Sequence, residues 1–218
     1  MNKFAISSLI AAGALLAACG SKSDASDKNF SLALDQYLAK KGDVCLGSMT
    51  VRKWPVEVED TTGLNFVPKA SPTDDAAQMK ALESVGLAKG TYMEVDQLMG
   101  AQPRGRKHKV WRYELSDMGK KAVRDRSSGS GLVDLCFASK RIDKIVKWDA
   151  VENTGSAAGT NVTYLYKLDG LQDWATKPEI QSAFPRVKAL IADAGKKEER
   201  HGVKLTSLGW EAMGMNAE

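Results

Sequence analysis

The cysteines are the residues whose chemistry the sequence defines best, because a thiolate bonds stably to lipid, metal or another sulfur. The chain has three, Cys19, Cys45 and Cys136. Cys19 follows Leu16-Ala17-Ala18, at the point where an apolar segment ends and a polar one begins. Lys3 and an apolar run over 4–14 precede it, and together these features predict a cleaved secretory signal over residues 1–18. The run is too short to span a bilayer, which takes about 20 apolar residues.

The cysteine directly after the small residues gives this signal a second property. Leu16-Ala17-Ala18-Cys19 resembles the lipobox of bacterial lipoproteins. The resemblance implies that Cys19 receives a diacylglycerol thioether and an N-acyl chain after cleavage, and several chains together anchor a protein stably. Enteric lipoproteins retained in the inner membrane have an aspartate where this chain has Gly20, so the resemblance implies the periplasmic side of the outer membrane. The alternative is an ordinary signal peptide followed by a chance cysteine.

Lipidation of Cys19 would leave Cys45 and Cys136, an even number of thiols in an oxidising compartment. We therefore predict a disulfide between them. The alternative is a pair of buried free thiols, which pack as small apolar side chains. The sequence gives no distance between the two positions, and a disulfide depends on that distance.

A basic segment is the second feature that could bind something. It contains Arg104, Arg106, Lys107, His108 and Lys109. Residues 73–124 loosely resemble the winged-helix fold of bacterial regulators, through the segments 81–87 and 113–121, and the resemblance makes this segment the wing. A protein anchored outside the cytoplasm does not meet DNA, so nucleic acid is not an expected partner. We expect this segment to bind anionic lipid, lipopolysaccharide or cell-wall polymer. The alternative is a solvated charged loop.

Motifs for catalysis and metal binding do not occur. Ser127-Ser128-Gly129-Ser130-Gly131 lacks the Gly-x-Ser-x-Gly frame, and the chain has no HExxH, CxxC or P-loop pattern. The only histidines, His108 and His201, lie in polar runs, and Asp74-Asp75 fits the charge of a helix start better than a catalytic pair. We assign no catalytic residue, no metal site and no cofactor.

Composition places the chain among ordinary globular proteins, with 27% charged and 43% hydrophobic residues. Cleavage after residue 18 leaves 200 of the 218 residues and removes Lys3, so the formal net charge falls from +4 to +3. This charge is too small to indicate a nucleic-acid partner. Periodicity and capping residues predict an α+β fold. Helices are expected over 29–41, from Ser71 to 85, over 116–124, from Thr176 with a break at Pro185, and after Thr206. Strands are expected over 44–59, 92–95, 109–115, 133–149, 162–168 and 203–205.

Two halves of the chain resemble each other. Segment 44–47 matches 135–138, and segment 113–122 matches 203–212 at almost the same spacing. The linker-like stretch 125–131 lies between them. We therefore predict an internal duplication, with a lipidated, flexible tether over 19–28 and similar sub-domains over 29–126 and 132–218. Chance similarity of short segments is the alternative.

Five tryptophans complete the candidate residues. Trp54 and Trp148 follow a lysine at matching places in the two halves, which indicates core packing or an aromatic groove between the halves. The combined features favour a lipid-anchored envelope protein with a non-enzymatic binding or scaffolding role. The rivals are an envelope hydrolase whose site is assembled from scattered residues, and an accessory protein for envelope stress or antibiotic protection.

Overall fold

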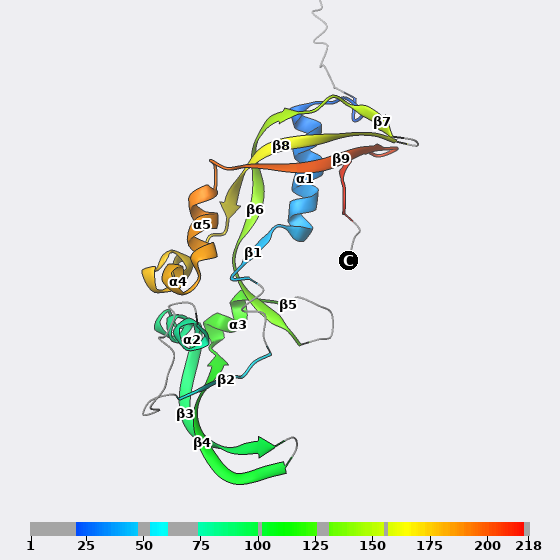
Figure 1. The fold of residues 1–218 in the computed structure, drawn as a ribbon. Coiled ribbons are helices and arrows are strands. Elements are labelled where there is room, and N and C mark those ends of the chain that lie inside the picture. The colour runs from blue at the N-terminus through cyan, green and yellow to red at the C-terminus, as the bar shows by residue number, and fades with distance from the viewer. Residues whose placement is uncertain are drawn as a thin grey trace, which may run out of the picture.

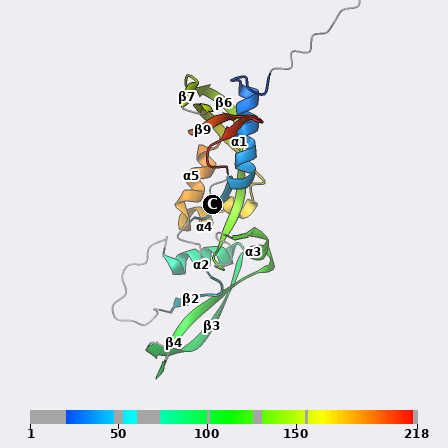
Figure 2. The ribbon, with the colours of Figure 1, turned by 90° about the vertical axis from the view of Figure 1, so that its right-hand side faces the viewer.

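The computed structural model describes residues 21–47, 53–60, 74–99, 102–125, 131–154 and 157–215. Helices and antiparallel sheets form an α+β fold, as the sequence predicts. Two views at right angles show an elongated molecule, with a large sheet and its helix at one end and a long β-hairpin at the other (Figures 1 and 2). We call the helical region between these ends the waist.

The large sheet has the strand order β1-β6-β8-β9-β10, with β5 pairing with β6 and β7 pairing with β8. Its strands are β1 (Asp43–Cys45), β5 (Val123–Asp125), β6 (Val133–Trp148), β7 (Glu152–Thr154), β8 (Ala157–Asp169), β9 (Glu198–Thr206) and β10 (Gly209–Ala212). Helix α1 (Asp27–Lys41) packs against β6 and β10. Its C-cap is Gly42, whose N–H donates to the Leu38 carbonyl at 2.8 Å. The core under α1 contains Phe30, Leu34 and Val162, all fully buried.

The small sheet has the order β2-β4-β3, from β2 (Val56–Glu59), β3 (Ala88–Met99) and β4 (Gln102–Leu115). The predicted basic loop is therefore wrong: residues 102–109 continue strand β4 and pair with β3. Cross-strand hydrogen bonds extend the hairpin past the point where the apolar alternation of the sequence stops. The hairpin projects away from the waist at the end of the molecule opposite α1 (Figure 1).

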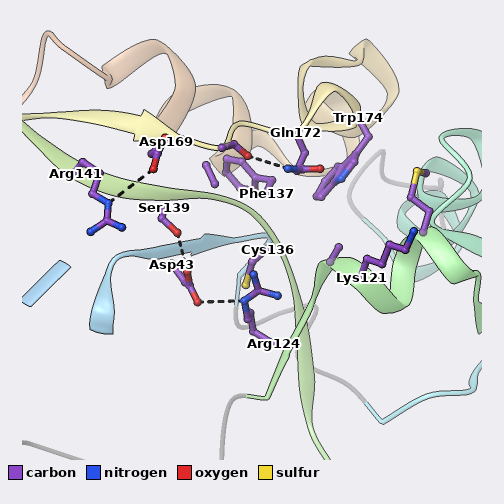
Figure 3. A pocket seen from close by; sticks show the side chains of 14 residues that line it. Asp43, Lys121, Arg124, Cys136, Phe137, Ser139, Arg141, Asp169, Gln172 and Trp174 are labelled. Carbon is purple, nitrogen blue, oxygen red and sulfur yellow. Dashed lines mark hydrogen bonds and ion pairs between the residues drawn. The ribbon is translucent and has the colours of Figure 1, made fainter. Parts of the chain in front are cut away.

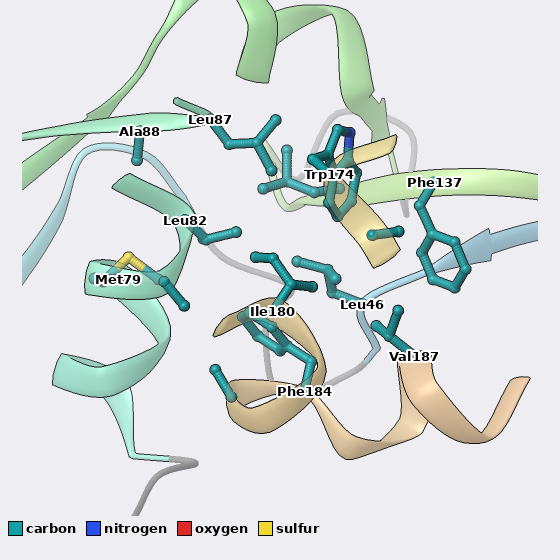
Figure 4. Close-up of a cluster of buried hydrophobic side chains, with 14 of the residues drawn as sticks. Leu46, Met79, Leu82, Leu87, Ala88, Phe137, Trp174, Ile180, Phe184 and Val187 are labelled. Atoms are coloured by element: carbon teal, nitrogen blue, oxygen red, sulfur yellow. The ribbon is translucent and has the colours of Figure 1, made fainter. Parts of the chain in front are cut away.

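The waist is formed by α2 (Asp75–Ser84), α3 (Asp117–Ala122), the 3₁₀ helix η2 (Asp173–Thr176), α4 (Pro178–Ala183) and α5 (Pro185–Asp193). Buried side chains from both ends of the molecule meet there. In Figure 4, Met79 and Leu82 of α2 face Ile180 and Phe184, while Leu46 lies beside Val187 across the same core. One apolar core therefore joins the two sheets.

Several helix boundaries differ from the prediction. Asp74 caps α2, accepting from the Ala77 N–H at 2.8 Å, so the helix begins after the expected Ser71, which lies outside the described residues. The capping box at Thr176 does not form, because its hydroxyl donates to the Asp173 carbonyl within η2. The break at Pro185 is confirmed, since α4 ends and α5 begins there.

The predicted C-terminal helix is also wrong, since the chain after Thr206 turns and forms strand β10 against β9. The Trp210 indole is buried beside Phe30, with ring centroids 4.9 Å apart, and its N–H donates to the Ser23 and Asp24 carbonyls at 3.1 Å. Tertiary packing of this side chain outweighs the local helix-start signal.

The internal duplication is not confirmed. The aligned segments 116–122 and 206–212 fold differently, the first as helix α3 and the second as a turn followed by β10. Elements from before the predicted linker, α1 and β1, pack on β6 from after it. Residues 126–130 of that linker lie outside the described residues.

Candidate functional site

The two cysteines of the predicted disulfide lie opposite each other on β1 and β6, where they are Cα partners. The structure joins Cys45 and Cys136 by a disulfide. Both side chains are buried, and Cys136 also lines a groove at the waist. The bridge therefore connects the edge strand β1 to the wall of that groove.

The waist groove has a volume of about 480 Å³ and is the candidate functional site (Figure 3). Side chains from β1, α3, β5, β6, the end of β8 and η2 contribute to it. The residues that define it are Asp43, Met118, Lys121, Arg124, Arg141, Asp169, Gln172 and Trp174, with Phe137 and Ser139. Its size is within the range of small-molecule sites.

The rim of the groove is charged, and two buried aromatic side chains lie beneath it. Phe137 and Trp174 are buried edge to face, with ring centroids 6.1 Å apart. At the rim, the Arg124 Nε lies 3.5 Å from Asp43, and the Arg141 Nε lies 3.9 Å from Asp169. Lys121 is exposed, and no hydrogen bond or ion pair of its side chain is found within the described part of the chain. Three cations therefore face two carboxylates, and Lys121 is the one available to a ligand.

The groove continues across the waist into a second hollow of about 460 Å³. Met118, Gln172 and Trp174 line both hollows. The second is bounded by Val85 at the end of α2 and by Lys177 before α4. The shared lining residues show that the two hollows are neighbours at the waist.

The arrangement does not assemble a hydrolase triad. Ser139 Oγ donates to Asp43 at 2.9 Å, but neither histidine lines the groove. His108 lies on β4, 4.0 Å from Glu59, and His201 lies on β9, bonded to the Met213 carbonyl. A serine needs an adjacent base to become a nucleophile. Within the described ranges, no three His, Cys, Asp or Glu side chains gather closely enough to hold a metal ion.

The basic segment forms a strand in which positive and negative charges alternate. Lys107 is paired in register with Asp96, and Lys109 with Glu94, on exposed positions of the hairpin. Arg104 and Arg106 also belong to strand β4, but their side chains are not among those that the structure describes. An acidic residue therefore stands opposite two of the four cationic residues of this segment. These carboxylates weaken the electrostatic attraction of the strand to an anionic surface. Binding of such a surface by this strand stays a prediction.

A cluster of two tyrosines, Lys140 and Glu199 lies on the large sheet, outside the lining of the groove. Lys140 pairs with Glu199 and lies 4.3 Å from the centre of the Tyr166 ring, while the Tyr164 hydroxyl donates to Glu199 at 3.3 Å. Burial, reinforced by the negative charge of Glu199, raises the pKa of Tyr166 to about 12 and raises that of Tyr164 as well. The contacts of Lys140, Tyr164 and Glu199 join β6, β8 and β9.

The tryptophans proposed to share a groove are apart. Trp54 packs on the waist core, whereas Trp148 contacts Phe30 under α1, with ring centroids 5.2 Å apart. The aromatic residue of the waist groove is Trp174, which the sequence did not single out. Lys121, Arg124 and Arg141 were missed too, because each resembles an ordinary surface charge.

No protein-family model, curated protein or solved structure matches this chain. None of the helices in the described part of the chain has the length and apolar character that crossing a membrane requires.

Proposed function

We propose that this chain is a lipid-anchored protein of the bacterial envelope that binds a ligand without transforming it. The observation that carries the anchor is the position of Cys19 directly after an apolar run and Leu16-Ala17-Ala18. The anchor places the folded part on the periplasmic side, most consistently at the outer membrane because Gly20 follows the cysteine. An oxidising compartment also suits the Cys45–Cys136 disulfide.

The waist groove is the proposed binding site. A rim in which cations outnumber carboxylates favours a ligand with an anionic group, such as a carboxylate or phosphate, and Trp174 is among the residues that line the groove. Lys121 is the residue assigned to the anionic group. The separation of Ser139 from both histidines supports binding over the rival hydrolysis.

The anchor is tested by the change Cys19→Ser. Without the thiol no thioether can form, so the variant should lose incorporation of a palmitate analogue and remain an uncleaved precursor. Metabolic labelling followed by electrophoresis measures both. Labelling of the variant at the level of the wild type would contradict the lipid anchor.

The groove is tested by reversing the charge of Lys121. Lys121→Glu should reduce capture of the ligand from crosslinked envelopes by about tenfold, since it opposes the anionic group with a like charge. Lys120→Glu is the matched control, because Lys120 is the neighbouring residue of α3 and pairs with Asp117 at 3.2 Å, outside the groove lining. Equal capture by both variants would exclude the groove as the binding site.

A further inference from the structure

The first described residues of the chain are fixed to the fold and do not form the expected flexible tether. The Ser21 N–H donates to Asp24 at 2.7 Å, and the Asn29 side-chain amide donates to the Ser21 and Asp24 carbonyls at 2.9 Å. The Trp210 indole N–H donates to the Ser23 and Asp24 carbonyls. Residues 27 and 28 already belong to α1. The segment 21–28 is therefore part of the anchor end of the molecule.

The lipid-bearing residue must lie close to this end. Cys19 precedes Ser21 by two positions, and consecutive Cα atoms are about 3.8 Å apart, so their Cα atoms are separated by about 8 Å at most. The backbone of Lys22 passes close to Gly209 in the β9–β10 turn. If Gly209 had a Cβ atom, that atom would lie 3.3 Å from the Lys22 carbonyl oxygen. A membrane that holds lipid on Cys19 is thus brought to the start of α1 and to this turn.

The two most exposed large apolar side chains among the described residues are found at the same end. Leu208 in the β9–β10 turn is 86% exposed, and Leu32 on α1 is 60% exposed. Both line a groove of about 610 Å³ together with Lys22 and Trp210. Isolated exposed leucines are common on protein surfaces, but this pair coincides with the residue that would bear the lipid.

We propose that this surface, made of Lys22, Leu32 and Leu208, contacts the bilayer that holds the lipid of Cys19. The inference rests on the proposed lipid anchor. Leu208 at the tip of its turn enters the boundary between headgroups and acyl chains, Leu32 follows it, and Lys22 remains among the headgroup phosphates. Contact at two places, the lipid and the turn, fixes how the molecule stands on the membrane.

This orientation has a consequence for the binding site. The β3–β4 hairpin lies at the end of the molecule opposite α1, with the waist between them (Figures 1 and 2). A contact at Leu208 therefore turns the waist groove and the hairpin away from the anchoring bilayer. The groove is then open to ligands of the periplasmic space.

The test uses the lipidated full chain carrying Leu208→Cys, bound to preformed vesicles of phosphatidylethanolamine and phosphatidylglycerol. Cys45 and Cys136 are bridged and Cys19 bears the lipid, so the introduced thiol is the reactive one. A charged maleimide that does not cross membranes should react about tenfold more slowly on vesicles than with the unlipidated Cys19→Ser form of the same variant, as expected for a leucine position removed from water. Lys120→Cys is the control, because its side chain is 66% exposed on α3 and should react equally in both states.

Each outcome separates the contact from the anchor. A protein that floats with the vesicles while its introduced thiol at position 208 reacts at the rate of the unlipidated form keeps the anchor and overturns the contact. If the wild-type chain does not float with the vesicles, both the lipid anchor and the bilayer contact are contradicted. Equal protection of the thiol in Lys120→Cys would indicate that the molecule lies flat on the membrane. Protection that depends on the ratio of protein to lipid would indicate contact with a second copy of the chain. Either result overturns the proposed contact.

Discussion

Replacement of both Cys45 and Cys136 by alanine should lower the free energy of unfolding by about 4 kcal/mol. The disulfide joins residues 91 positions apart, and the chain-entropy model assigns about 4–5 kcal/mol to a closed loop of this size. Strand β1 has three residues, and the bridge joins it covalently to β6. Urea unfolding, followed by tryptophan fluorescence, measures the change.

Thiol titration provides the control for this prediction. Wild-type protein isolated from an oxidising compartment should have no free thiol after denaturation without reductant, and added reductant should reproduce the loss of stability seen in the double variant. Two titratable thiols per chain would show that the bridge does not form in the isolated protein, and a loss below about 1 kcal/mol would contradict the predicted stabilisation.

Local signals in the sequence predicted the elements that they control locally. The apolar stripe of α1 and Gly42 at its end gave the right helix, and Ser116 accepts from the Gly119 N–H at 3.0 Å as the cap of α3. Pro185 broke the helix where its missing N–H requires. In each case the determining interaction connects residues within one or two turns.

The failures have the opposite origin. Strand β10 depends on Trp210 reaching carbonyls of the segment 21–26, which is remote in sequence. The long β4 strand depends on β3 as a partner, and its charged residues carry no apolar alternation. Non-local pairing energies of this kind leave no periodic pattern in the sequence.

The candidate site was not predictable for a similar reason. Asp43, Lys121 and Arg141 stand on three elements that only the folded waist brings together. Each one alone is typical of a solvated surface. The disulfide was the part of this region that sequence reasoning reached, because cysteine count and compartment constrain it without any knowledge of the fold.

The hairpin and α1 lie at opposite ends of the molecule, with the waist between them (Figure 1). If Cys19 is lipidated as we propose, the bilayer that holds it therefore lies at the other end of the molecule from β4. An anionic surface bound by the basic segment of β4 would then be a polymer or a second membrane.

Gly119→Ala should destabilise the protein by about 3 kcal/mol, although alanine is the better helix former. Helix propensity alone would stabilise α3 by about 1 kcal/mol. A Cβ atom at Gly119 would lie 2.0 Å from the Leu87 carbonyl oxygen and 3.1 Å from a methyl group of Leu115. That carbonyl already accepts from the Ser116 N–H at 3.0 Å, so it cannot move away without breaking the bond that begins α3. Overpacking against fixed backbone therefore outweighs the gain in propensity.

Thermal and urea unfolding of Gly119→Ala, compared with Lys120→Ala, decide between these two effects. Lys120 is on the same helix, and Lys120→Ala removes only an exposed ion pair with Asp117. This replacement should therefore change the free energy of unfolding by less than about 0.5 kcal/mol. The packing of α3 on Leu87 also positions Met118 and Lys121 at the groove. Gly119→Ala should hence weaken ligand capture together with stability, whereas a neutral or stabilising result would show that α3 does not press against the start of β3.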